Sequence, residues 1–396
     1  IMKCVILAAG KGNRMYPLTQ TRPKVMVPIA NKPILEHLLI RAKRVGIDEF
    51  IFVVGYKKEL IESYFEDGSK WDVKINYIHQ KEQLGTADAI GVTKDVAGKR
   101  FLVLNGDVLI GSECIAELLK KSDDSVMTLT KRDGKGFGVV EVEGDAVTRI
   151  IEKPKGVTES CLVNAGIYVF DHSIFTAIEG TPLSERGEYE ITDSLQSMVD
   201  GGNDVSYQIV EDWIDVGYPW NLLDANEGLL KNIKGEIRGT VEERATIRGE
   251  VVVGERTNIR NGAYIEGPVL IGNDCDIGPN CYIRPSTSIG DHVRVGNGVE
   301  IKNSILMNHT KVGHLTYIGD SVIGEGCNFG AGTIVANLRH DNAPIKARVK
   351  EEKIDSGRRK LGVILGDGVK TGINSTLNVG TVLKPGRMVL PGENVW

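Results

Sequence analysis

The sequence predicts two domains of different fold class: an N-terminal α/β domain with a mostly parallel sheet, and an all-β C-terminal domain that forms a parallel β-helix of hexapeptide repeats. Three observations lead to this prediction. The length of 396 residues suits two or three domains. Strand patterns alternate with helical patterns in the first half, and aliphatic residues recur at a spacing of six in the second half.

The first half alternates apolar strands with helical patterns. We expect strands at Lys3–Ala8, Glu49–Val54, Val73–Ile78 and Phe101–Leu104, and helices at Pro33–Gly46, Lys58–Phe65 and Thr86–Val96. This order predicts a mostly parallel sheet with helices on both faces. Ligands of such sheets bind beyond the carboxyl ends of the strands, so the residues after each strand are the candidate site residues.

The second half carries an uninterrupted series of eleven aliphatic residues, each six positions after the last. They are Val241, Ile247, Val253, Ile259, Ile265, Ile271, Ile277, Ile283, Ile289, Val295 and Ile301. A period of six is neither that of a strand nor that of a helix, and it is typical of stacked β-helix coils. The series slips by one residue at Leu306 and at Ile323, breaks after Val335, and resumes at Leu365.

The change of period sets the expected domain boundaries. We expect one domain over residues 2–218, a linker helix over 219–235 and the β-helix over 236–396. Residues 338–360 fit no period and are rich in Lys and Arg. An insertion that interrupts a solenoid usually forms a loop on its binding side, so we expect ligand contacts there.

Composition argues against several classes of function. The net charge of −5 favours neither a nucleic-acid nor a membrane partner, and no apolar run approaches the roughly 18 residues of a membrane span. We expect no signal peptide, because no basic region followed by an apolar stretch and a cleavage site stands before the first strand, and the six cysteines form no CxxC pair. We therefore expect a cytoplasmic protein with reduced thiols.

A glycine-rich turn follows the first strand and reads Leu7-Ala8-Ala-Gly10-Lys-Gly12-Asn-Arg14-Met15. It is not a dinucleotide-binding GxGxxG motif, because Met15 stands at the third glycine, and it lacks the GK[ST] of a Walker A motif. Its glycines still allow backbone N–H groups to approach phosphates closely. Arg14 and Lys24 add positive charge nearby in the sequence.

The string from Leu7 to Pro33 resembles the opening motif of the sugar-1-phosphate nucleotidylyltransferases, with Asn13 in place of the usual Ser or Thr. The resemblance implies a Rossmann-like nucleotidyltransferase domain. It implies that the nucleotide is held by Leu7, Ala8, Gly10 and Gly12. It also implies that Arg14 and Lys24 are catalytic, because they grip the triphosphate and stabilise the charge of the transition state.

Later segments resemble the same family. The segment Gln80–Thr86, which includes Gly85, resembles the family's segment that recognises a pyrimidine base. The resemblance implies that Gln80 pairs with uracil or thymine. Asp107 matches the family's Mg²⁺ ligand, and Asp215 matches the second metal carboxylate of thymidylyltransferases, where bacterial uridylyltransferases have Asn. The sugar-phosphate side is implied to comprise Gly138, Glu152, Lys153 and Asn164. UTP and dTTP both remain open as the nucleotide.

A second constellation lies where the repeat slips and breaks. The string Gly313-His314-Leu-Thr-Tyr317-Ile-Gly-Asp320 resembles the acetyltransferase half of the bifunctional N-acetylglucosamine-1-phosphate uridyltransferases / glucosamine-1-phosphate acetyltransferases. That resemblance implies a left-handed β-helix and names His314 as general base. It implies an acetyltransferase site formed by Arg284, Lys302, Tyr317, Asn328, Ala331 and Asn337, with Ala331 contacting acetyl-CoA. Lys346 in the basic insertion is our choice for a further contact.

The sequence departs from the bacterial pattern at residues 338–341 and at Ile373, so the residues that contact acetyl-CoA stay open. In these departures the sequence resembles the archaeal versions of the enzyme more than the bacterial ones. The first hypothesis is a bifunctional enzyme that acetylates glucosamine 1-phosphate with acetyl-CoA and then joins the product to UTP with Mg²⁺, releasing pyrophosphate. Its partners are then amino-sugar 1-phosphates, nucleotide and acetyl-CoA, and we expect a homotrimer through the β-helix.

Two alternatives belong to other classes. One is a monofunctional glucose-1-phosphate thymidylyltransferase or uridylyltransferase whose β-helix is purely structural; Asp215 favours it and the His314 string argues against it. The other is a non-enzymatic regulatory or scaffolding relative, against which the complete set Arg14, Lys24, Asp107 and Asp215 argues.

Overall fold

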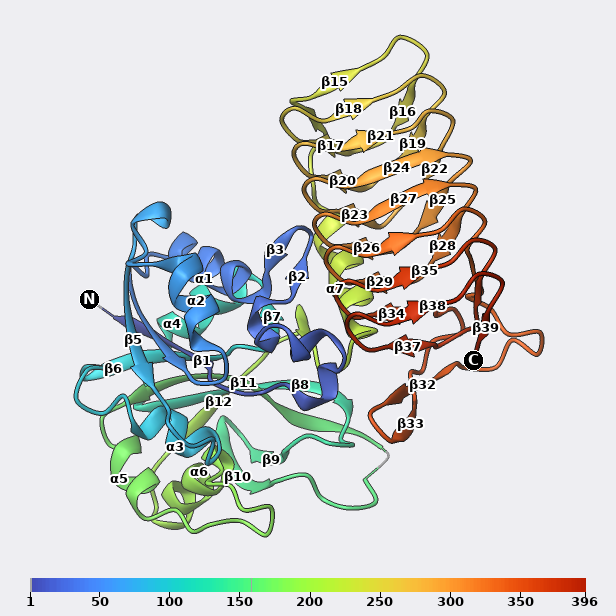
Figure 1. Ribbon diagram of the computed structural model, residues 1–396. Coiled ribbons are helices and arrows are strands. Elements are labelled where there is room, and N and C mark those ends of the chain that lie inside the picture. Colours follow the sequence, from blue (N-terminus) through green and yellow to red (C-terminus); the bar gives the residue numbers. More distant parts are fainter. Residues whose placement is uncertain (1, 158) are drawn as a thin grey trace. The chain divides into compact units, whose positions relative to one another are not determined.

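The computed structural model describes residues 2–157 and 159–396 (Figure 1). They divide into two compact units. The first unit holds the residues up to Lys11, Pro23–Met26 and Ile34–Asp215. The second unit holds Gly12–Arg22, Val27–Pro33 and Val216–Trp396, so two short pieces of the N-terminal region cluster with the β-helix.

A nine-stranded sheet forms the centre of the first unit, in the order β5-β4-β1-β6-β11-β8-β12-β10-β9. Its strands are β1 (Lys3–Ala8), β4 (Glu49–Val54), β5 (Lys74–His79), β6 (Arg100–Asn105), β8 (Ser125–Asp133), β9 (Val139–Glu143), β10 (Ala146–Ile151), β11 (Ser160–Asp171) and β12 (Val205–Ile209). The predicted strands β5, β4, β1 and β6 are all parallel. Beyond β6 the sheet is mixed, because β11 runs antiparallel to both β6 and β8.

Helices cover both faces of this sheet, as predicted. One face packs against α1 (Ile34–Arg44), α2 (Lys58–Phe65) and α4 (Ser112–Lys120). The other packs against α3 (Thr86–Gly91), α5 (Ile174–Glu179) and α6 (Ile191–Asp200). Successive strand residues point to opposite faces, so Ile6 lies in the first core and Val5 in the second. Burial on both faces explains why the strands read as continuous apolar runs.

One predicted helix is shorter than expected. Helix α3 ends at Gly91, whereas the sequence pattern extended it to Val96. Gly91 is a weak helix former, and the Thr93 hydroxyl donates to the carbonyl of Ile90 at 2.7 Å, within a series of turns. The helical spacing of the apolar residues therefore continued past the point where the backbone leaves the helix.

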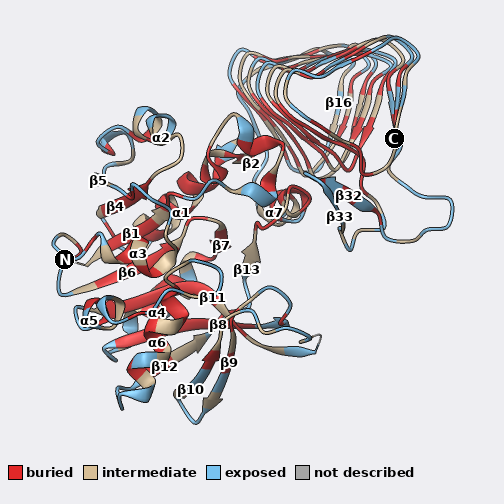
Figure 2. Cartoon of the chain, turned by 60° about the horizontal axis from the view of Figure 1, so that its bottom comes forward, coloured by how far each residue is buried: buried red, intermediate tan, exposed pale blue. Residues whose placement is uncertain are grey.

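The second unit contains three parallel sheets of eight strands each, which form the sides of a left-handed parallel β-helix, as predicted (Figure 2). The first sheet comprises β14 (Glu236–Ile237), β17 (Val251–Val253), β20 (Val269–Ile271), β23 (Thr287–Ile289), β26 (Ile305–Leu306), β29 (Val322–Ile323), β34 (Ile364–Leu365) and β37 (Val382–Leu383). The second comprises β15 (Thr240–Val241), β18 (Asn258–Ile259), β21 (Asp276–Ile277), β24 (Arg294–Asn297), β27 (Lys311–His314), β30 (Asn328–Phe329), β35 (Lys370–Thr371) and β38 (Met388–Val389). The third comprises β16 (Thr246–Arg248), β19 (Tyr264–Glu266), β22 (Tyr282–Ile283), β25 (Glu300–Lys302), β28 (Tyr317–Gly319), β31 (Ile334–Val335), β36 (Thr376–Leu377) and β39 (Asn394–Val395).

The aliphatic series lines the interior of this β-helix. Val241 pairs with Ile259 and Ile259 pairs with Ile277, so one coil uses three hexads. Ile259, Ile265 and Ile271 belong to one buried core. Figure 2 shows buried segments, in red, recurring from coil to coil. Where the series slips, Ile289 pairs with Leu306 instead, and the coil is one residue shorter.

The basic insertion forms a projecting hairpin. Ile323 pairs with Leu365, and the residues between them include the hairpin strands β32 (Lys346–Val349) and β33 (Glu352–Asp355). An isolated bridge between Leu338 and Lys360 closes its base. The insertion therefore leaves the stacking of the coils on either side unchanged.

The predicted linker helix is α7 (Asn221–Leu230), which is shorter than the expected span. Its buried Asn226 accepts from the Ala30 N–H at 3.0 Å and donates to the Ser286 carbonyl at 3.0 Å. The two-stranded piece β2 (Pro28–Ile29) and β3 (Lys32–Pro33) is held in the same way, since Asn31 donates to the Ile289 carbonyl at 2.6 Å. No helix within the described ranges is long and apolar enough to cross a membrane.

Candidate functional sites

The first candidate site lies at the carboxyl end of β6. The Gly106 N–H donates to the Leu7 carbonyl at 3.0 Å, and a Cβ at position 106 would come within 2.4 Å of that oxygen. Glycine therefore lets the chain turn closely past β1 and places Asp107 beside the short helix η3 (Lys24–Met26). Lys24 Nζ lies 2.8 Å from Asp107 Oδ2, and Lys24 is only 8% exposed. Two predicted site residues thus form an ion pair between a buried lysine and a partly exposed aspartate.

Asp215 reaches the same region through a short antiparallel ribbon. Strand β13 (Trp213–Asp215) pairs with β7 (Val108–Ile110), and Asp215 is the register partner of Val108, the residue after Asp107. The two predicted metal carboxylates therefore lie at one end of the ribbon. Carboxylate oxygens suit Mg²⁺, which usually takes few protein ligands and completes its shell with water and phosphate. Among the described residues, no cluster of three or more His, Cys, Asp or Glu could hold a metal.

Hydrogen bonds and close packing hold the segment after β5. Gln80 is buried, and its Nε2 donates to Asp88 Oδ2 at 2.7 Å and to the Gly85 carbonyl at 3.2 Å. Gly85 has φ +109°, and a Cβ there would lie 2.5 Å from the Tyr189 carbonyl. Thr86 accepts from the Ile191 N–H at 3.0 Å. Glycine is required for this packing, which fixes the orientation of the Gln80 amide.

The glycine-rich turn is divided between the two units. Leu7 and Ala8 end β1, and Gly10 is exposed, with no heavy atom within 4 Å of where its Cβ would be. In the second unit, Gly12 has φ +64° before the short helix η1 (Asn13–Met15). Arg14 is exposed there, with its guanidinium 5.4 Å from the centre of the Tyr218 ring.

Sequence reasoning missed a contact to this turn. Gln83 Nε2 donates to the Ala9 carbonyl at 2.9 Å, which ties the segment after β5 to the end of β1. The sequence carried no signal for it beyond the presence of an amide in the Gln80 segment.

The second cluster gathers most of the predicted sugar-side residues. A Cβ at Gly138 would lie 3.1 Å from Glu152 Oε2, 3.3 Å from Thr192 Cγ2 and 3.7 Å from Asn164 Cβ. The Asn164 N–H donates to the Gly138 carbonyl at 2.8 Å, and the Thr192 hydroxyl donates to Glu152 Oε2 at 2.9 Å. These side chains come from β11, α6 and the ends of β9 and β10. Thr192 was missed, because only the fold brings α6 to this point.

The polar groups of this cluster are held in fixed orientations. Asn164 Nδ2 donates to the Tyr168 hydroxyl at 2.7 Å, and Asn164 Oδ1 accepts from the Gly166 N–H at 3.0 Å. Burial raises the pKa of Tyr168, so its hydroxyl stays protonated. Lys153 Nζ and Arg186 Nη2 lie 3.3 Å and 3.4 Å from Glu152 Oε1. Arg186 is the second residue that the sequence did not reveal, because it lies in a turn without periodicity.

The third cluster lies on the third sheet of the β-helix and centres on Asp320, which is 2% exposed. Its carboxylate accepts from Lys302 Nζ at 3.1 Å, Asn303 Nδ2 at 2.8 Å and Asn337 Nδ2 at 2.6 Å. Asn337 Nδ2 also donates to the Tyr317 hydroxyl at 3.1 Å. Three predicted residues, Lys302, Tyr317 and Asn337, are therefore joined through one buried carboxylate. Asp320 stands in the quoted motif, but sequence reasoning gave it no role.

Arg284 lies on the same sheet and pairs with Glu300, with Nη1 2.9 Å from Oε1. Glu300 is the register partner of Tyr317, so the arginine is held beside the Asp320 cluster. Burial raises the pKa of Tyr317, which keeps a neutral hydroxyl donor in this cluster.

His314 ends β27 at the corner before the third sheet. It is exposed, and its imidazole makes no hydrogen bond within the described part of the chain. Its carbonyl accepts from the Thr316 hydroxyl at 2.8 Å, which fixes the backbone of the corner. An imidazole held by its backbone but free at its ring can accept a proton from a bound amine.

The remaining predicted acetyltransferase residues lie outside the Asp320 network. Asn328 is on the second sheet, between its register partners Lys311 and Lys370. Ala331 lies in the turn after β30, and its carbonyl accepts from the Asn374 N–H at 2.8 Å. Lys346 is exposed on the hairpin of the insertion.

Comparisons with known proteins agree with both halves of this description. A model of the nucleotidyl transferase family matches residues 3–232, and a model described as the GMPPB C-terminal domain matches residues 265–390. The bifunctional protein GlmU of Methanocaldococcus jannaschii is 42% identical over 396 residues, covering 100% of this chain and 93% of that protein.

Two further relatives extend the comparison. The bifunctional sugar-1-phosphate nucleotidylyltransferase/acetyltransferase of Sulfurisphaera tokodaii is 39% identical over 401 residues, covering 100% of this chain and 97% of that protein. A solved structure named as a glucose-1-phosphate thymidylyltransferase from Bacillus anthracis, in complex with a sucrose, has a TM-score of 0.53 and 28% identity, and it covers 60% of this chain and 98% of that one. On the family match and the identity over its full length, the chain belongs to the nucleotidyl transferase family.

Proposed function

We propose that the chain is a bifunctional enzyme that acetylates glucosamine 1-phosphate with acetyl-CoA and then transfers UMP from UTP to the product, releasing pyrophosphate. One observation carries this proposal: each unit contains its own polar cluster, Lys24–Asp107 with Asp215 in the first and Asp320 with Lys302, Tyr317 and Asn337 in the second. Relatives over the full length are named as bifunctional, which supports the same conclusion.

In the nucleotidyl transfer, a phosphate oxygen of the sugar phosphate attacks the α-phosphorus of UTP in line. The new P–O bond forms as the bond to the β-phosphate oxygen breaks, and pyrophosphate leaves with that electron pair. Asp107 and Asp215 would hold Mg²⁺, which supplies charge neutralisation on the phosphates. Lys24 is held beside Asp107 by their ion pair and adds a fixed positive charge. Arg14 is proposed as a further cation for the triphosphate.

The sugar would bind against Gly138, where the absence of a side chain leaves room in front of Glu152 and Asn164. Glu152 can accept from sugar hydroxyls, and the oriented Asn164 amide can bind a hydroxyl or an N-acetyl group. We propose Lys153 and Arg186 as the cations that face the sugar phosphate.

In the acetyl transfer, the amine of glucosamine 1-phosphate attacks the thioester carbonyl. His314 takes the proton from the amine, and the carbon–sulfur bond breaks as CoA leaves. The Tyr317 hydroxyl accepts from Asn337, so its own hydrogen can be donated to the developing oxyanion or to the sugar, while Asn337 orients Tyr317 and can accept from the sugar through Oδ1. Lys302 and Arg284 can bind the phosphate of the sugar. We assign Asn328, Ala331 and Lys346 to the binding of acetyl-CoA or of the sugar phosphate.

Two further properties belong to this proposal. We propose assembly as a homotrimer through the β-helix, which sedimentation of the full chain would test. We also propose a cytoplasmic location, since all six cysteines are free thiols.

The experiment that tests the function is a matrix of nucleoside triphosphates against sugar 1-phosphates, each with and without acetyl-CoA. Pyrophosphate release reports the first activity, and thiol release reports the second. His314→Ala should lower thiol release by about 100-fold or more and leave pyrophosphate release near wild type. Loss of both activities, or of neither, contradicts the assignment, and His172→Ala is the matched control on an exposed histidine.

A second candidate is a monofunctional thymidylyltransferase. Asp215 favours it, because a second carboxylate at this position resembles thymidylyltransferases, and the solved structure with a TM-score of 0.53 bears that name. In the same matrix it predicts a preference for dTTP with glucose 1-phosphate and no thiol release with any amino-sugar phosphate.

A further inference from the structure

The buried amide of Gln80 can meet a ligand through its oxygen only. The residue is 4% exposed. Its Nε2 donates to Asp88 Oδ2 at 2.7 Å and to the Gly85 carbonyl at 3.2 Å, which uses both hydrogens of the nitrogen. Within the described residues, Oε1 takes part in no hydrogen bond, and it is not one of the fully enclosed polar atoms that lack a partner. The oxygen is therefore the atom of this amide that remains for a ligand.

Asp88 decides which way this amide faces. A carboxylate has no hydrogen to donate, and neither has the Gly85 carbonyl, so both must face the nitrogen of the amide and not its oxygen. Turning the amide over would place Oε1 against two acceptors. The contact to Asp88 is the shorter of the two, and hydrogen bonds to charged groups are the stronger kind. Asp88 therefore contributes more than Gly85 to the orientation of the Gln80 amide.

The backbone holds both side chains in place. The Gln80 N–H donates to the Val54 carbonyl at 2.9 Å, which fixes the chain beside the end of β4. Asp88 lies in the first turn of α3, where the Ala89 N–H donates to the Gly85 carbonyl at 3.1 Å. An acidic side chain is favourable in the first turn of a helix. The contact between Gln80 and Asp88 is therefore made by two segments that are each held by backbone hydrogen bonds.

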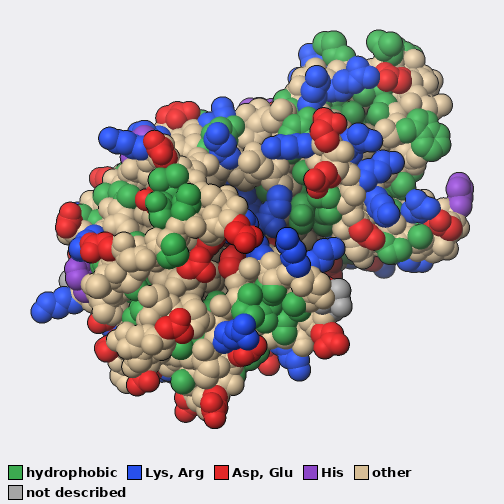
Figure 3. Space-filling model, turned by 90° about the horizontal axis from the view of Figure 1, so that it is seen from below, with side chains coloured by type: hydrophobic (Ala, Val, Ile, Leu, Met, Phe, Trp, Pro, Cys, Tyr) green, Lys and Arg blue, Asp and Glu red, His purple; other side chains and the backbone are tan. Residues whose placement is uncertain are grey.

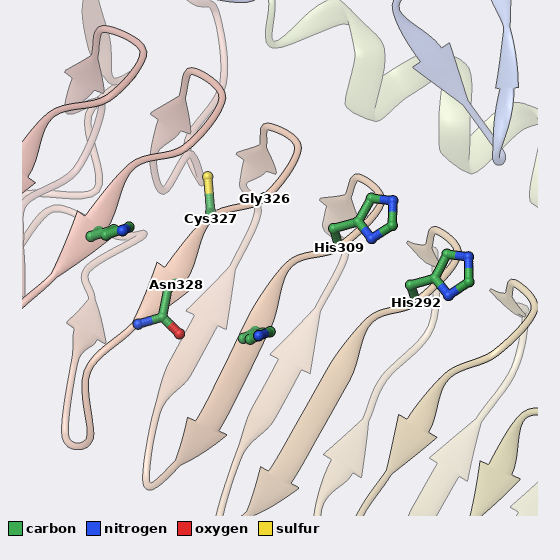
Figure 4. A pocket seen from close by; sticks show the side chains of 7 residues that line it. His292, His309, Gly326, Cys327 and Asn328 are labelled. Carbon is green, nitrogen blue, oxygen red and sulfur yellow. The ribbon is translucent and has the colours of Figure 1, made fainter.

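A carboxylate that fixes a buried amide differs from the other polar groups of the surface. Figure 3 shows Asp and Glu side chains scattered over the visible face of the molecule. A contrasting case is the hollow on the second sheet of the β-helix, which is lined by His292, His309 and Asn328 (Figure 4). Within the described residues, these three side chains make no hydrogen bond, so no such bond fixes which of their atoms would face a ligand.

An amide that offers only its oxygen distinguishes between pyrimidine bases. Uracil and thymine carry a hydrogen at N3, which the Gln80 oxygen can accept. Cytosine carries a lone pair at N3, which would face the lone pairs of the same oxygen without a hydrogen between them. A buried acceptor that is left unpaired is costly, and this cost rejects the wrong ligand.

We propose that Asp88 is a positioning residue that makes the base site select uracil or thymine over cytosine. It holds Nε2 of Gln80 and so leaves Oε1 to accept from N3–H of the base, without touching the nucleotide itself. This inference rests on the proposed nucleotidyl transfer, and it goes beyond that function by naming the residue that sets the choice of base.

Kinetic selectivity among UTP, dTTP and CTP tests the proposal. Pyrophosphate release is measured with N-acetylglucosamine 1-phosphate and Mg²⁺, and the readout is kcat/KM for UTP or dTTP divided by kcat/KM for CTP. Asp88→Asn removes the charge with little change of shape, and the new amide can turn either its oxygen or its nitrogen toward Gln80. We expect the ratio to fall about tenfold, roughly the worth of one hydrogen bond, through a higher KM for UTP and a lower KM for CTP.

Two further variants separate positioning from stability. Asp88→Glu keeps a carboxylate and should keep the ratio close to that of the wild type. Asp95→Asn removes the same charge from an exposed position after α3 and is the matched control. An unchanged ratio in Asp88→Asn, or an equal loss of rate with every nucleotide, overturns the proposal while turnover of UTP or dTTP by the wild type upholds the proposed function. Absence of turnover with every nucleotide in the wild type contradicts the proposed function, and this inference with it.

Discussion

Arg22 and Asp367 form an ion pair across 345 positions of the chain, with Nη2 of the arginine 2.5 Å from Oδ2 of the carboxylate. The same Nη2 lies 3.1 Å from Glu325 Oε2. Asp367 Oδ1 also accepts from the Glu325 N–H at 2.8 Å, so one carboxylate organises both partners. Because Arg22 ends the Gly12–Arg22 segment, the piece of chain that carries Arg14 is anchored to two coils of the β-helix.

This anchor predicts the effect of removing Arg22. Arg22→Ala leaves two partly buried carboxylates facing each other without a cation, and we expect the second unit to lose about 1–3 kcal/mol of unfolding free energy. Urea unfolding of the full chain measures this. Pyrophosphate release should also fall, because the Arg14 segment loses its attachment. Arg339→Ala breaks an exposed pair with Asp341 and is the control, with an expected shift too small to measure. Equal unfolding curves for Arg22→Ala and wild type would rule the anchor out.

Removing a metal carboxylate should separate the two activities. Asp107→Asn takes away one oxygen ligand and leaves the buried Lys24 ammonium without its partner. We expect pyrophosphate release to fall by about 100-fold or more and acetyl transfer to stay within about twofold of wild type. Raising Mg²⁺ should restore part of the lost rate. Asp145→Asn, in the turn between β9 and β10, is the exposed control.

Removing the charge of the buried Asp320 carboxylate should impair acetyl transfer and leave pyrophosphate release unchanged. Asp320→Asn keeps the shape but removes the charge that Lys302 and Asn337 share, so the KM for glucosamine 1-phosphate in acetyl transfer should rise about tenfold. Thermal unfolding should report destabilisation of about 3–5 kcal/mol, since a buried pair is broken. Pyrophosphate release is the internal control. Wild-type KM values in both reactions would exclude a positioning role for Asp320.

The cysteines of the β-helix core predict a loss of stability at high pH. Burial raises the pKa of Cys275 to about 11 and those of Cys281 and Cys327 to about 12. The unfolded chain loses these thiol protons near pH 9, while the folded core keeps them. The contribution of the three thiols to the free energy of unfolding is therefore complete below pH 9 and is lost as pH rises toward 12. Urea midpoints at pH 8 and pH 10.5 measure the loss. A Cys→Ala variant at all three positions should show a smaller decrease, and an equal decrease in both proteins contradicts the assignment.

Much of the fold could be predicted because its signals are local. The series from Val241 to Ile301 predicted the interior of the coils, and the slips at Leu306 and Ile323 coincide with the shorter coils. The predicted end of helix α3 at Val96 was wrong, because the helical spacing of apolar residues continues beyond Gly91, where the helix ends. The mixed half of the sheet beyond β6 carried no local signal, because strand direction depends on where a strand pairs and not on its own residues.

The candidate sites were likewise predictable where their signals are local and unpredictable where they depend on tertiary packing. The sequence by itself determined which side-chain types stand at the ends of strands and corners: Lys24, Asp107, His314 and Tyr317 were all recognisable as parts of motifs. Only the tertiary structure decided their partners, placing Thr192 against Glu152, Asp320 beneath Lys302 and Asn337, and Arg22 on Asp367. The physical reason is that a repeat or motif reports spacing along the chain, whereas a buried charge takes its partner from whichever distant segment the packing brings within hydrogen-bond reach.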